Sequence, residues 1–334
     1  MNEQTEQTHR RRRISVGDVT YVLGSLFMSI MRAFPAPQRI RAINKASPFL
    51  GRLLHAANIP PTRTIRENLH TMFDSNRSPD EIETHIRRLL SMLVWNSLMI
   101  NNLPAFTREQ IIDLVPMDGI SCLDDYLAGG HPVLIWGYHF GISPLIIAGL
   151  LHMRGYPIHA IAHVRQTPAT ASMLQFFYFL QMQSISDQLS VIDPGKSVQR
   201  DALDVFKNKE CLYVTPDYMI PERERRPRSA FEVPIDFLGR KAYLQTGGLR
   251  LAKRFGVKVV TVLSTQADGE NRRLLVEPFE LPTSGFKPPE LQQDLQMCVE
   301  RLQAQVIAHP YWWLDLRRND LTRRLKKSPT EPGE

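Results

Sequence analysis

The chain has 334 residues, of which 43% are hydrophobic and 22% are charged. This balance is typical of a packed globular protein and excludes a disordered or fibrous one, and the length fits one large α/β domain. The three cysteines lie far apart without a CxxC pair, which argues against a disulfide framework or a zinc site and favours a reducing compartment.

The net charge of +7 is concentrated toward the two ends of the chain. HRRRR occupies positions 9–13, and two further clusters, RR (317–318) and RRLKK (323–327), lie near the C-terminus. Such clusters occur in nucleic-acid patches, on anionic membrane surfaces and in solvated tails. No aromatic residues interleave with them, as single-stranded nucleic-acid binding would require, so we expect no nucleic-acid partner.

The first apolar stretch, VTYVLGSLFMSIMRAFP (19–35), is interrupted by Arg32 before it reaches the roughly 20 apolar residues of a transmembrane helix. No small-x-small cleavage motif follows it, which argues against a signal peptide. A basic segment leading into a short apolar helix, with a second basic amphipathic stretch at 39–59, is typical of helices that lie in a membrane interface. We therefore expect a basic tail (1–15) and membrane-associating helices (16–57).

Two capping-box patterns predict the next helices. SPDE (78–81) places Ser78 as N-cap with Glu81 reaching back, and it begins a helix that ends at Pro104. TREQ (107–110) begins a shorter helix in the same way.

From about residue 116, short aliphatic runs alternate with helical patterns. The expected strands are 132–137, 158–164, 189–192, 211–215 and 257–263. This alternation predicts an α/β fold with a mixed, mostly parallel sheet flanked by helices, and the continuous apolar runs fit strands buried on both faces. We expect one such domain over 58–317, followed by a basic C-terminal tail (318–334).

Two motif-like stretches do not predict a site. DPGKS (193–197) ends like a P-loop, but Ser190 stands where that loop requires glycine, so nucleotide binding is not expected. His159 and His163 lie in a strand-like run without a nearby third ligand, which favours structural roles over a metal site.

His139 directly follows the predicted strand 132–137, in the stretch GYHFGISPL. It should therefore lie at the carboxyl edge of the sheet, where open α/β proteins bind their ligands. By position alone it is either a catalytic residue or an ordinary loop residue.

Five stretches, taken in their order and spacing, resemble the bacterial lipid A late acyltransferases (lauroyl and myristoyl transferases) of the lysophospholipid acyltransferase superfamily. They are NIPPTRTIRENLHTMF (58–73), HFG (139–141), HVRQTPATASMLQFF (163–177), TPDYMIPERERRPRSAFEVPIDFLGRKAYLQTGGLRLAKRFGVKVV (215–260) and HPYWWLDLRR (309–318). The resemblance covers roughly residues 20–318 and implies a glycerolipid acyltransferase-like fold.

The resemblance implies that His139 is a general base. In the family, a histidine and an Asp or Glu separated by four residues form a dyad. The imidazole removes a proton from the acceptor hydroxyl as it attacks a thioester, and the carboxylate fixes the imidazole tautomer. Here Pro144 stands at the carboxylate position. Proline suits the first turn of a helix, with Ser143 as N-cap, but it cannot orient an imidazole.

Three explanations for the missing carboxylate remain open. In the first, Asp217 takes over, because it follows the strand 211–215 and matches the family's acidic motif, although Tyr218 replaces the usual glutamine. In the second, His139 acts without a carboxylate in a slower or different acyl transfer. In the third, the protein is an inactive relative that binds lipid or a partner enzyme.

The resemblance also implies residues that bind the substrate. Arg165 matches a basic residue that meets a phosphate or a developing negative charge, for which a guanidinium is well suited. The other expected substrate-binding residues are Tyr138, Gly141, Gly239 and Thr246. Thr246 is equally placed to cap the helix that follows it.

The closing motif combines Trp312 and Trp313 with Arg317 and Arg318. Tryptophans beside arginines suit a membrane interface, where the rings lie among head groups. The sequence therefore predicts a second contact with the membrane near the end of the domain.

The expected function is transfer of a fatty acyl group from an acyl carrier protein or coenzyme A thioester to a lipid or another hydroxyl or amine acceptor. The expected location is the cytoplasmic face of the inner membrane, where the protein is peripheral or held by a single short N-terminal anchor. The alternative is a catalytically inactive protein of the same fold that serves as a lipid-binding or assembly subunit. No metal or organic cofactor is implied.

Overall fold

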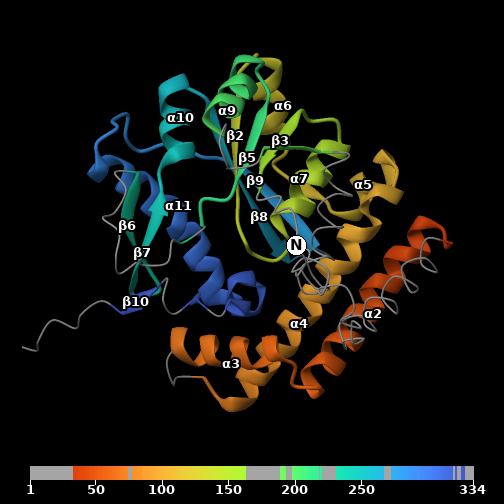
Figure 1. Ribbon diagram of the computed structural model, residues 1–334. Coiled ribbons are helices and arrows are strands. Elements are labelled where there is room, and N and C mark those ends of the chain that lie inside the picture. Colours follow the sequence, from red (N-terminus) through yellow and green to blue (C-terminus); the bar gives the residue numbers. More distant parts are fainter. Residues whose placement is uncertain are drawn as a thin grey trace, which may run out of the picture.

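A seven-stranded sheet lies at the centre of the molecule, with helices on both faces (Figure 1). The computed structural model describes residues 33–73, 77–162, 189–192, 198–217, 219, 231–266, 272–318, 320–321 and 325–327. In spatial order the strands are β1 (Met117–Asp118), β9 (Arg272–Pro278), β8 (Lys258–Gln266), β2 (Val133–Gly137), β5 (Cys211–Val214), β3 (Ile158–Ile161) and β4 (Ser190–Ile192).

The sheet is mixed and mostly parallel. β2 lies between β8 and β5 and runs parallel to both. Among the described strands of this sheet, β8 and β9 form the one antiparallel pair of neighbours. Strands are present at all five predicted positions, and the predicted α/β fold is confirmed. β1 and β9, which extend the sheet on one side, were not expected.

A second, smaller antiparallel sheet was also not expected. It consists of β6 (Glu232–Phe237), β7 (Arg240–Gln245) and β10 (Lys326–Lys327). β6 and β7 form a hairpin whose two turn residues, Leu238 and Gly239, have φ values of 54° and 66°. Positive φ at both central residues is the mark of a two-residue turn that matches the twist of the strands.

The helices include those that the capping boxes predict. At the start of one, the side chains of Ser78 and Glu81 each accept the other's backbone N–H, and Thr107 and Gln110 do the same at the start of another. The helices are α2 (Ala36–Ala56), α3 (Pro60–Met72), α4 (Pro79–Asn102), α5 (Arg108–Leu114), α6 (Ser121–Ala128), α7 (Pro144–Met153), α9 (Val198–Lys207), α10 (Gly247–Phe255) and α11 (Pro288–Ala308), with 3-10 turns η2 (Leu103–Ala105), η3 (Pro310–Trp312) and η4 (Leu314–Arg317).

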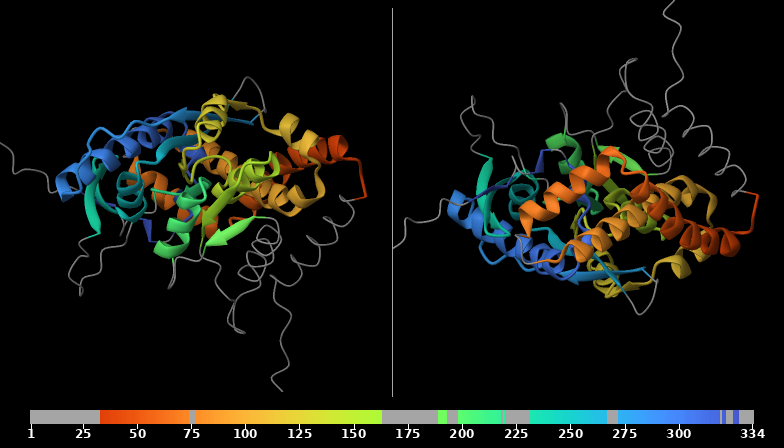
Figure 2. Two further views of the ribbon diagram at one scale, coloured as in Figure 1. Left: turned by 90° about the horizontal axis from the view of Figure 1, so that it is seen from above. Right: turned by 90° about the horizontal axis from the view of Figure 1, so that it is seen from below.

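The central sheet separates two apolar cores. Helices cover both faces of this sheet in the two views of Figure 2. Leu134 and Trp136 of β2 face the core formed with α3, α9, α10 and α11. Val133 and Ile135 face the core formed with α5, α6 and α7. The residues of β2 alternate in this way because successive side chains of a strand point to opposite faces. α4 contributes side chains to both cores and so joins the two halves of the molecule.

α2 packs along α4 through one narrow stripe. Ile43, Ser47 and Gly51 are buried, and a Cβ at Gly51 would overlap Ser91 of α4, so the two helices cross in direct backbone contact. Phe49 and Leu53 lie on the outer side of α2 and are 60% and 51% exposed. No helix in the described part of the chain combines the length and the apolar character needed to cross a membrane. The stretch 19–32 lies outside the described residues.

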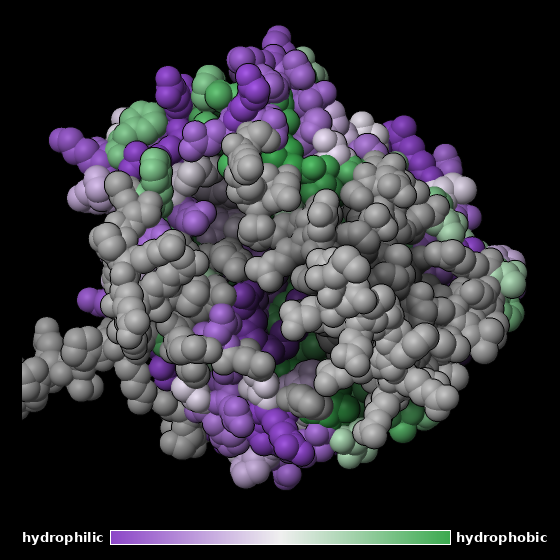
Figure 3. Space-filling view, in the orientation of Figure 1, coloured by the Kyte–Doolittle hydropathy of each residue, from purple (hydrophilic) through white to green (hydrophobic). Residues whose placement is uncertain are grey.

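The face of the molecule seen in Figure 1 is hollowed near its centre. Hydrophilic residues lie deep within this hollow (Figure 3).

Candidate active site

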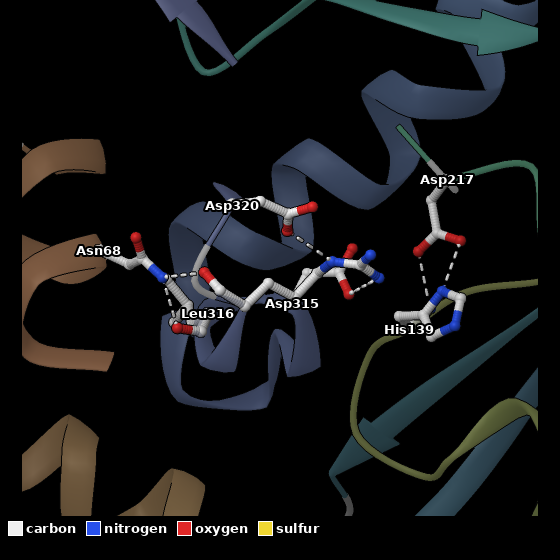
Figure 4. Close-up of polar contacts among 7 residues, drawn as sticks. Asn68, His139, Asp217, Asp315, Leu316 and Asp320 are labelled. Carbon is white, nitrogen blue, oxygen red and sulfur yellow. Dashed lines mark hydrogen bonds and ion pairs between the residues drawn. The ribbon is translucent and has the colours of Figure 1, made fainter. Parts of the chain in front are cut away.

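His139 lies just beyond the carboxyl end of β2, and Asp217 lies just beyond the carboxyl end of β5. Because these two strands are parallel neighbours, with Trp136 opposite Val214, the segments that follow them leave the sheet side by side. The Nδ1 atom of His139 is 3.0 Å from Oδ1 of Asp217 (Figure 4). The structure thus brings together the two residues that the sequence predicts as catalytic.

Asp217 contacts His139 through both carboxylate oxygens. Its Oδ2 accepts the backbone N–H of His139 at 2.7 Å, and its side chain is 1% exposed. This pair of hydrogen bonds fixes both the ring and the backbone of the histidine. With Nδ1 donating to the carboxylate, the lone pair is on Nε2. No described residue is hydrogen-bonded to Nε2, and the His139 side chain is 22% exposed.

The electrostatic surroundings favour a proton on His139. Burial lowers the pKa of the imidazole, but the charges of Asp217 and Asp315 and the hydrogen bond to Asp217 outweigh it, so the net pKa lies above its ordinary value. Arg317 opposes this rise. A raised pKa makes the imidazole a stronger base.

Gly141 shapes the turn that carries His139. Its φ is +66°, and a Cβ at this position would lie 2.6 Å from Cβ of Ser264 and 2.9 Å from the ring of Trp312. Side-chain-bearing residues rarely adopt this φ, so the turn requires glycine on both grounds. Ser264 also accepts the N–H of Ile142 through Oγ at 2.9 Å. The predicted role of Gly141 in substrate binding remains a prediction, beside this observed role in the backbone.

Asn96 of α4 holds the same turn from the opposite side. Its Nδ2 donates to the carbonyl of Gly141 at 2.9 Å, and its Oδ1 accepts the N–H of Ser143 at 2.8 Å. Both ends of the amide are thus used, and the side chain is 8% exposed. Nothing in the sequence analysis singled out Asn96.

The closing segment 309–318 packs against the same turn and is hydrogen-bonded to its backbone. Leu314 donates its N–H to the carbonyl of His139 at 2.8 Å, and the carbonyl of Trp312 accepts the N–H of Gly141 at 2.7 Å. Asn68 of α3 in turn holds the carbonyls of Leu316 and Arg318, at 2.7 and 2.9 Å. Hydrogen bonds to backbone groups therefore connect α3 to the closing segment and the closing segment to the turn that carries His139.

The closing segment also brings a second carboxylate, Asp315, into the electrostatic neighbourhood of His139 (Figure 4). Asp315 is 5% exposed, and its Oδ1 lies 3.6 Å from the guanidinium of Arg318. Burial raises the pKa of this carboxyl, and nearby His139 opposes the rise. The site is thus a cluster of alternating charges, with Asp217 and Asp315 near one imidazole and Arg317 and Arg318 close by.

A protein-family model, described as bacterial lipid A biosynthesis acyltransferase, matches residues 8–319. The chain belongs to this family. No curated protein sequence matches it. Family membership makes the chain an acyltransferase, and the family's reaction transfers an acyl group to a lipid.

This acyltransferase departs from its family's motif at Pro144, and the structure shows how the local fold accommodates the change. Pro144 is the first residue of α7 and follows Ser143 at the N-cap, as predicted. Ser143 does not cap the helix with its side chain, and its backbone N–H donates to Asn96. The geometry that the first of the three explanations requires is present, since Asp217 contacts the imidazole that Pro144 cannot orient.

The substrate-binding role of Tyr138 remains a prediction, and the structure places its side chain in the core. Its side chain is 1% exposed, and its hydroxyl lies 3.1 Å from the carbonyl and 3.0 Å from Sγ of Cys298 on α11. Tyr138 shares the alternation of β2 with Trp136 and points into the core, away from the exposed side of His139.

Gly239 and Thr246, which were also expected to bind substrate, each have a role in the local fold. Gly239 occupies the turn of the β6–β7 hairpin, where its positive φ is the constraint. Thr246 is fully buried. Its Oγ1 donates to the carbonyl of Phe231 at 3.0 Å and accepts from Arg250 at 3.0 Å. It stands at the N-cap position of α10, as the alternative expects, but its side chain does not cap the helix.

Trp312 and Trp313 are buried, at 5% and 0% exposure, and do not form the predicted membrane contact. Their rings pack against Phe140 and Phe237, with centroids 5.7 and 5.2 Å apart. Arg165 lies outside the described residues, as do Tyr218, His163 and the stretch 193–197.

The turn around His139 has few backbone donors left for a substrate. The N–H groups of His139, Gly141, Ile142 and Ser143 are all engaged, and Pro144 has none. From His139 to Pro144, Phe140 is thus the one residue whose N–H is not engaged within the described part of the chain. Among the described residues, no group of His, Cys, Asp and Glu is arranged to hold a metal ion.

Proposed function

We propose that this acyltransferase moves a fatty acyl group from a thioester, on an acyl carrier protein or coenzyme A, to a hydroxyl or amine of a lipid at the cytoplasmic face of the inner membrane. The observation that carries the proposal is the His139–Asp217 pair, with a 3.0 Å contact at Nδ1 and an imidazole that is 22% exposed. A base held in one tautomer next to an open face is what acceptor activation requires.

In the proposed reaction, Nε2 of His139 takes the proton of the acceptor as its oxygen or nitrogen attacks the thioester carbonyl carbon. Asp217 stabilises the imidazolium that forms. The tetrahedral intermediate then collapses, the carbon–sulfur bond breaks, and the leaving thiolate receives the proton from Nε2. The products are an ester or amide and a free thiol.

Arg317 supplies positive charge for the tetrahedral oxyanion in this scheme. Its side chain is exposed and acts electrostatically on His139. A guanidinium that is already in place stabilises developing negative charge without reorganisation during the reaction. This role falls to a side chain because most backbone donors of the turn are engaged.

The outer face of α2 supports the proposed membrane location. Arg41 and Lys45 are exposed and lie on the same helix face, at spacings of four residues, as Phe49 and Leu53, which are 60% and 51% exposed. Cations mixed with large apolar side chains on one helix face favour the interface of an anionic membrane. Loss of vesicle binding by Phe49→Ser/Leu53→Ser, measured by sedimentation with anionic vesicles, would support this location.

The test of function is acyl transfer by purified full-length protein in detergent, with acyl carrier protein and coenzyme A thioesters as donors. His139→Ala is expected to lower the rate by about 10²- to 10⁴-fold, the usual range for a general base. His159→Ala is the matched control, because His159 also contacts a carboxylate, Glu210, at 2.8 Å. Equal rates for wild type and His139→Ala would remove His139 from the mechanism. No turnover by the wild type with any donor would favour the inactive alternative.

A further inference from the structure

A cavity of about 680 Å³ lies between α2, α4, the start of β9 and η3. Figures 1 and 2 show α2 and α4 side by side in each view. The side chains that line it and carry charge are all arginines. They are Arg52, Arg87, Arg88 and Arg272. No acidic residue is among the described residues that line the cavity.

Two of the arginines on α4 are held in place by their neighbours. Arg87 donates to Oγ1 of Thr84 at 3.0 Å, and the guanidinium carbon of Arg88 lies 5.0 Å from the centre of the Tyr311 ring. A cation placed over an aromatic ring keeps its charge and loses side-chain freedom. The arginines are thus partly ordered before any ligand binds.

Within the described part of the chain, Arg52, Arg87 and Arg88 form no ion pair. The acid nearest in sequence, Glu83, is bound by Arg66 at 2.6 Å and by His55 at 2.6 Å, and the hydrogen bond from Arg66 lowers its pKa to about 2. Like charges around one cavity repel each other and raise the local affinity for anions.

The cavity adjoins the turn that carries His139. Trp312 lines it, and the carbonyl of the same residue accepts the N–H of Gly141. Ser91 and Met92 line it from α4, about one turn before Asn96, which holds the other side of that turn. A ligand in the cavity therefore lies against residues that fix the active site.

We propose that this cavity is a binding site for phosphate esters. Guanidinium groups match the geometry and charge of phosphate oxygens better than any other side chain, and the cavity volume fits a phosphate with an attached sugar or glycerol. Two sources share this chemistry, the head group of the lipid acceptor and the phosphates of the thioester donor. Anion binding stands by itself, whereas its assignment to a substrate rests on the proposed function.

The test measures binding of three soluble probes by titration calorimetry on full-length protein in detergent. Pyrophosphate reports the shared chemistry, dihexanoyl phosphatidic acid the lipid source and coenzyme A the donor source. The double variant Arg87→Gln/Arg88→Gln is expected to weaken pyrophosphate binding about tenfold or more, because it removes two charge-assisted contacts. Binding of the probe that represents the true source, dihexanoyl phosphatidic acid or coenzyme A, should weaken by a similar factor. Arg52→Gln repeats the test from α2 in case the double variant folds poorly.

The control is Arg63→Gln/Arg254→Gln, which removes the same charge at two exposed positions that do not line the cavity. It should bind pyrophosphate within about twofold of the wild type. An equal loss in both double variants, or wild-type affinity in the cavity variants, overturns the site. Binding by His139→Ala separates the two proposals: retained pyrophosphate affinity supports the cavity whether or not acyl transfer is found.

Discussion

Two histidine–carboxylate pairs lie on neighbouring strands of the same sheet. One is His139 with Asp217, at 3.0 Å, beyond the carboxyl ends of β2 and β5. The other is His159 with Glu210, at 2.8 Å, near the amino end of β5. The two pairs are alike in residue type and in the distance between the ring nitrogen and the carboxylate oxygen.

Their surroundings differ in the way that matters for chemistry. His159 uses both ring nitrogens, because Nδ1 contacts Oγ of Ser190 at 2.8 Å and Nε2 contacts Glu210. Glu210 is 30% exposed, whereas Asp217 is 1% exposed. No residue in the described ranges is hydrogen-bonded to Nε2 of His139, and the carboxylate of its partner is shielded from water. A histidine becomes a base when one nitrogen is held and the other is left open.

Replacing each carboxylate with its amide should distinguish the two pairs most clearly, through the rate of acyl transfer. Asp217→Asn is expected to lower the rate of acyl transfer by about 10²- to 10³-fold, less than removal of the base itself. Glu210→Gln should leave the rate within about twofold, because a partly exposed pair far from the reacting atoms contributes little. Steady-state kinetics with one thioester donor measures both. Similar losses in the two variants would mean that the pairs do not differ as described.

Removing the residue that holds each histidine segment in place should lower the stability of the protein by different amounts. Asn96→Ala leaves the carbonyl of Gly141 and the N–H of Ser143 without their partner, which is expected to lower the free energy of unfolding by about 2 to 4 kcal/mol. Ser190→Ala, which removes the exposed partner of His159, should cost less than about 1 kcal/mol. Denaturant unfolding gives both values, and a small cost for Asn96→Ala would show that the turn is held elsewhere.

The pH dependence tests the charge environment of His139. Its pKa is raised, so kcat/KM should rise with pH through a midpoint above the ordinary histidine value of about 6.5. Asp217→Asn removes the charge that raises the pKa while burial still lowers it, so the midpoint should move to lower pH. The stability that Asp217 contributes through His139 is fully present below the unfolded-state pKa and is lost as pH rises through the folded-state pKa. An unchanged midpoint in Asp217→Asn would contradict this assignment.

The smallest effect is expected at the position where the family motif has its acid. Pro144→Ala should leave the rate within about threefold, since position 144 has no proton to hold or move. It should cost about 1 kcal/mol or less in stability, mainly because alanine leaves the unfolded chain more freedom. A large loss of activity would show that the start of α7 matters for more than the local fold.

The meeting of His139 and Asp217 could be predicted because the carboxyl ends of parallel strands share one edge. That β5 rather than β3 neighbours β2 could not be read from the chain, although it decides the distance. Asn96 and Asn68 could not be found either. Their partners lie 45 and 248 residues away, and no local pattern marks a buried asparagine as a clamp.

Two sets of buried aromatic residues differ in what the sequence shows. Tyr138 continues the alternation of Leu134 and Trp136, which places it on the apolar side of β2. Trp312 and Trp313 are adjacent at the end of η3, so no alternation marks them, and their burial depends on ring contacts with the distant Phe140 and Phe237. The β6–β7 hairpin is different: its turn places Leu238 at positive φ, and leucine gives no turn signal.

A double-mutant cycle of His139→Ala and Asp217→Asn tests most directly whether the two residues act as one unit. The account predicts that the double variant is no slower than His139→Ala alone, because Asp217 acts only through the imidazole. If the two losses multiplied instead, Asp217 would act independently of His139, and the proposed replacement of the family's carboxylate would be wrong.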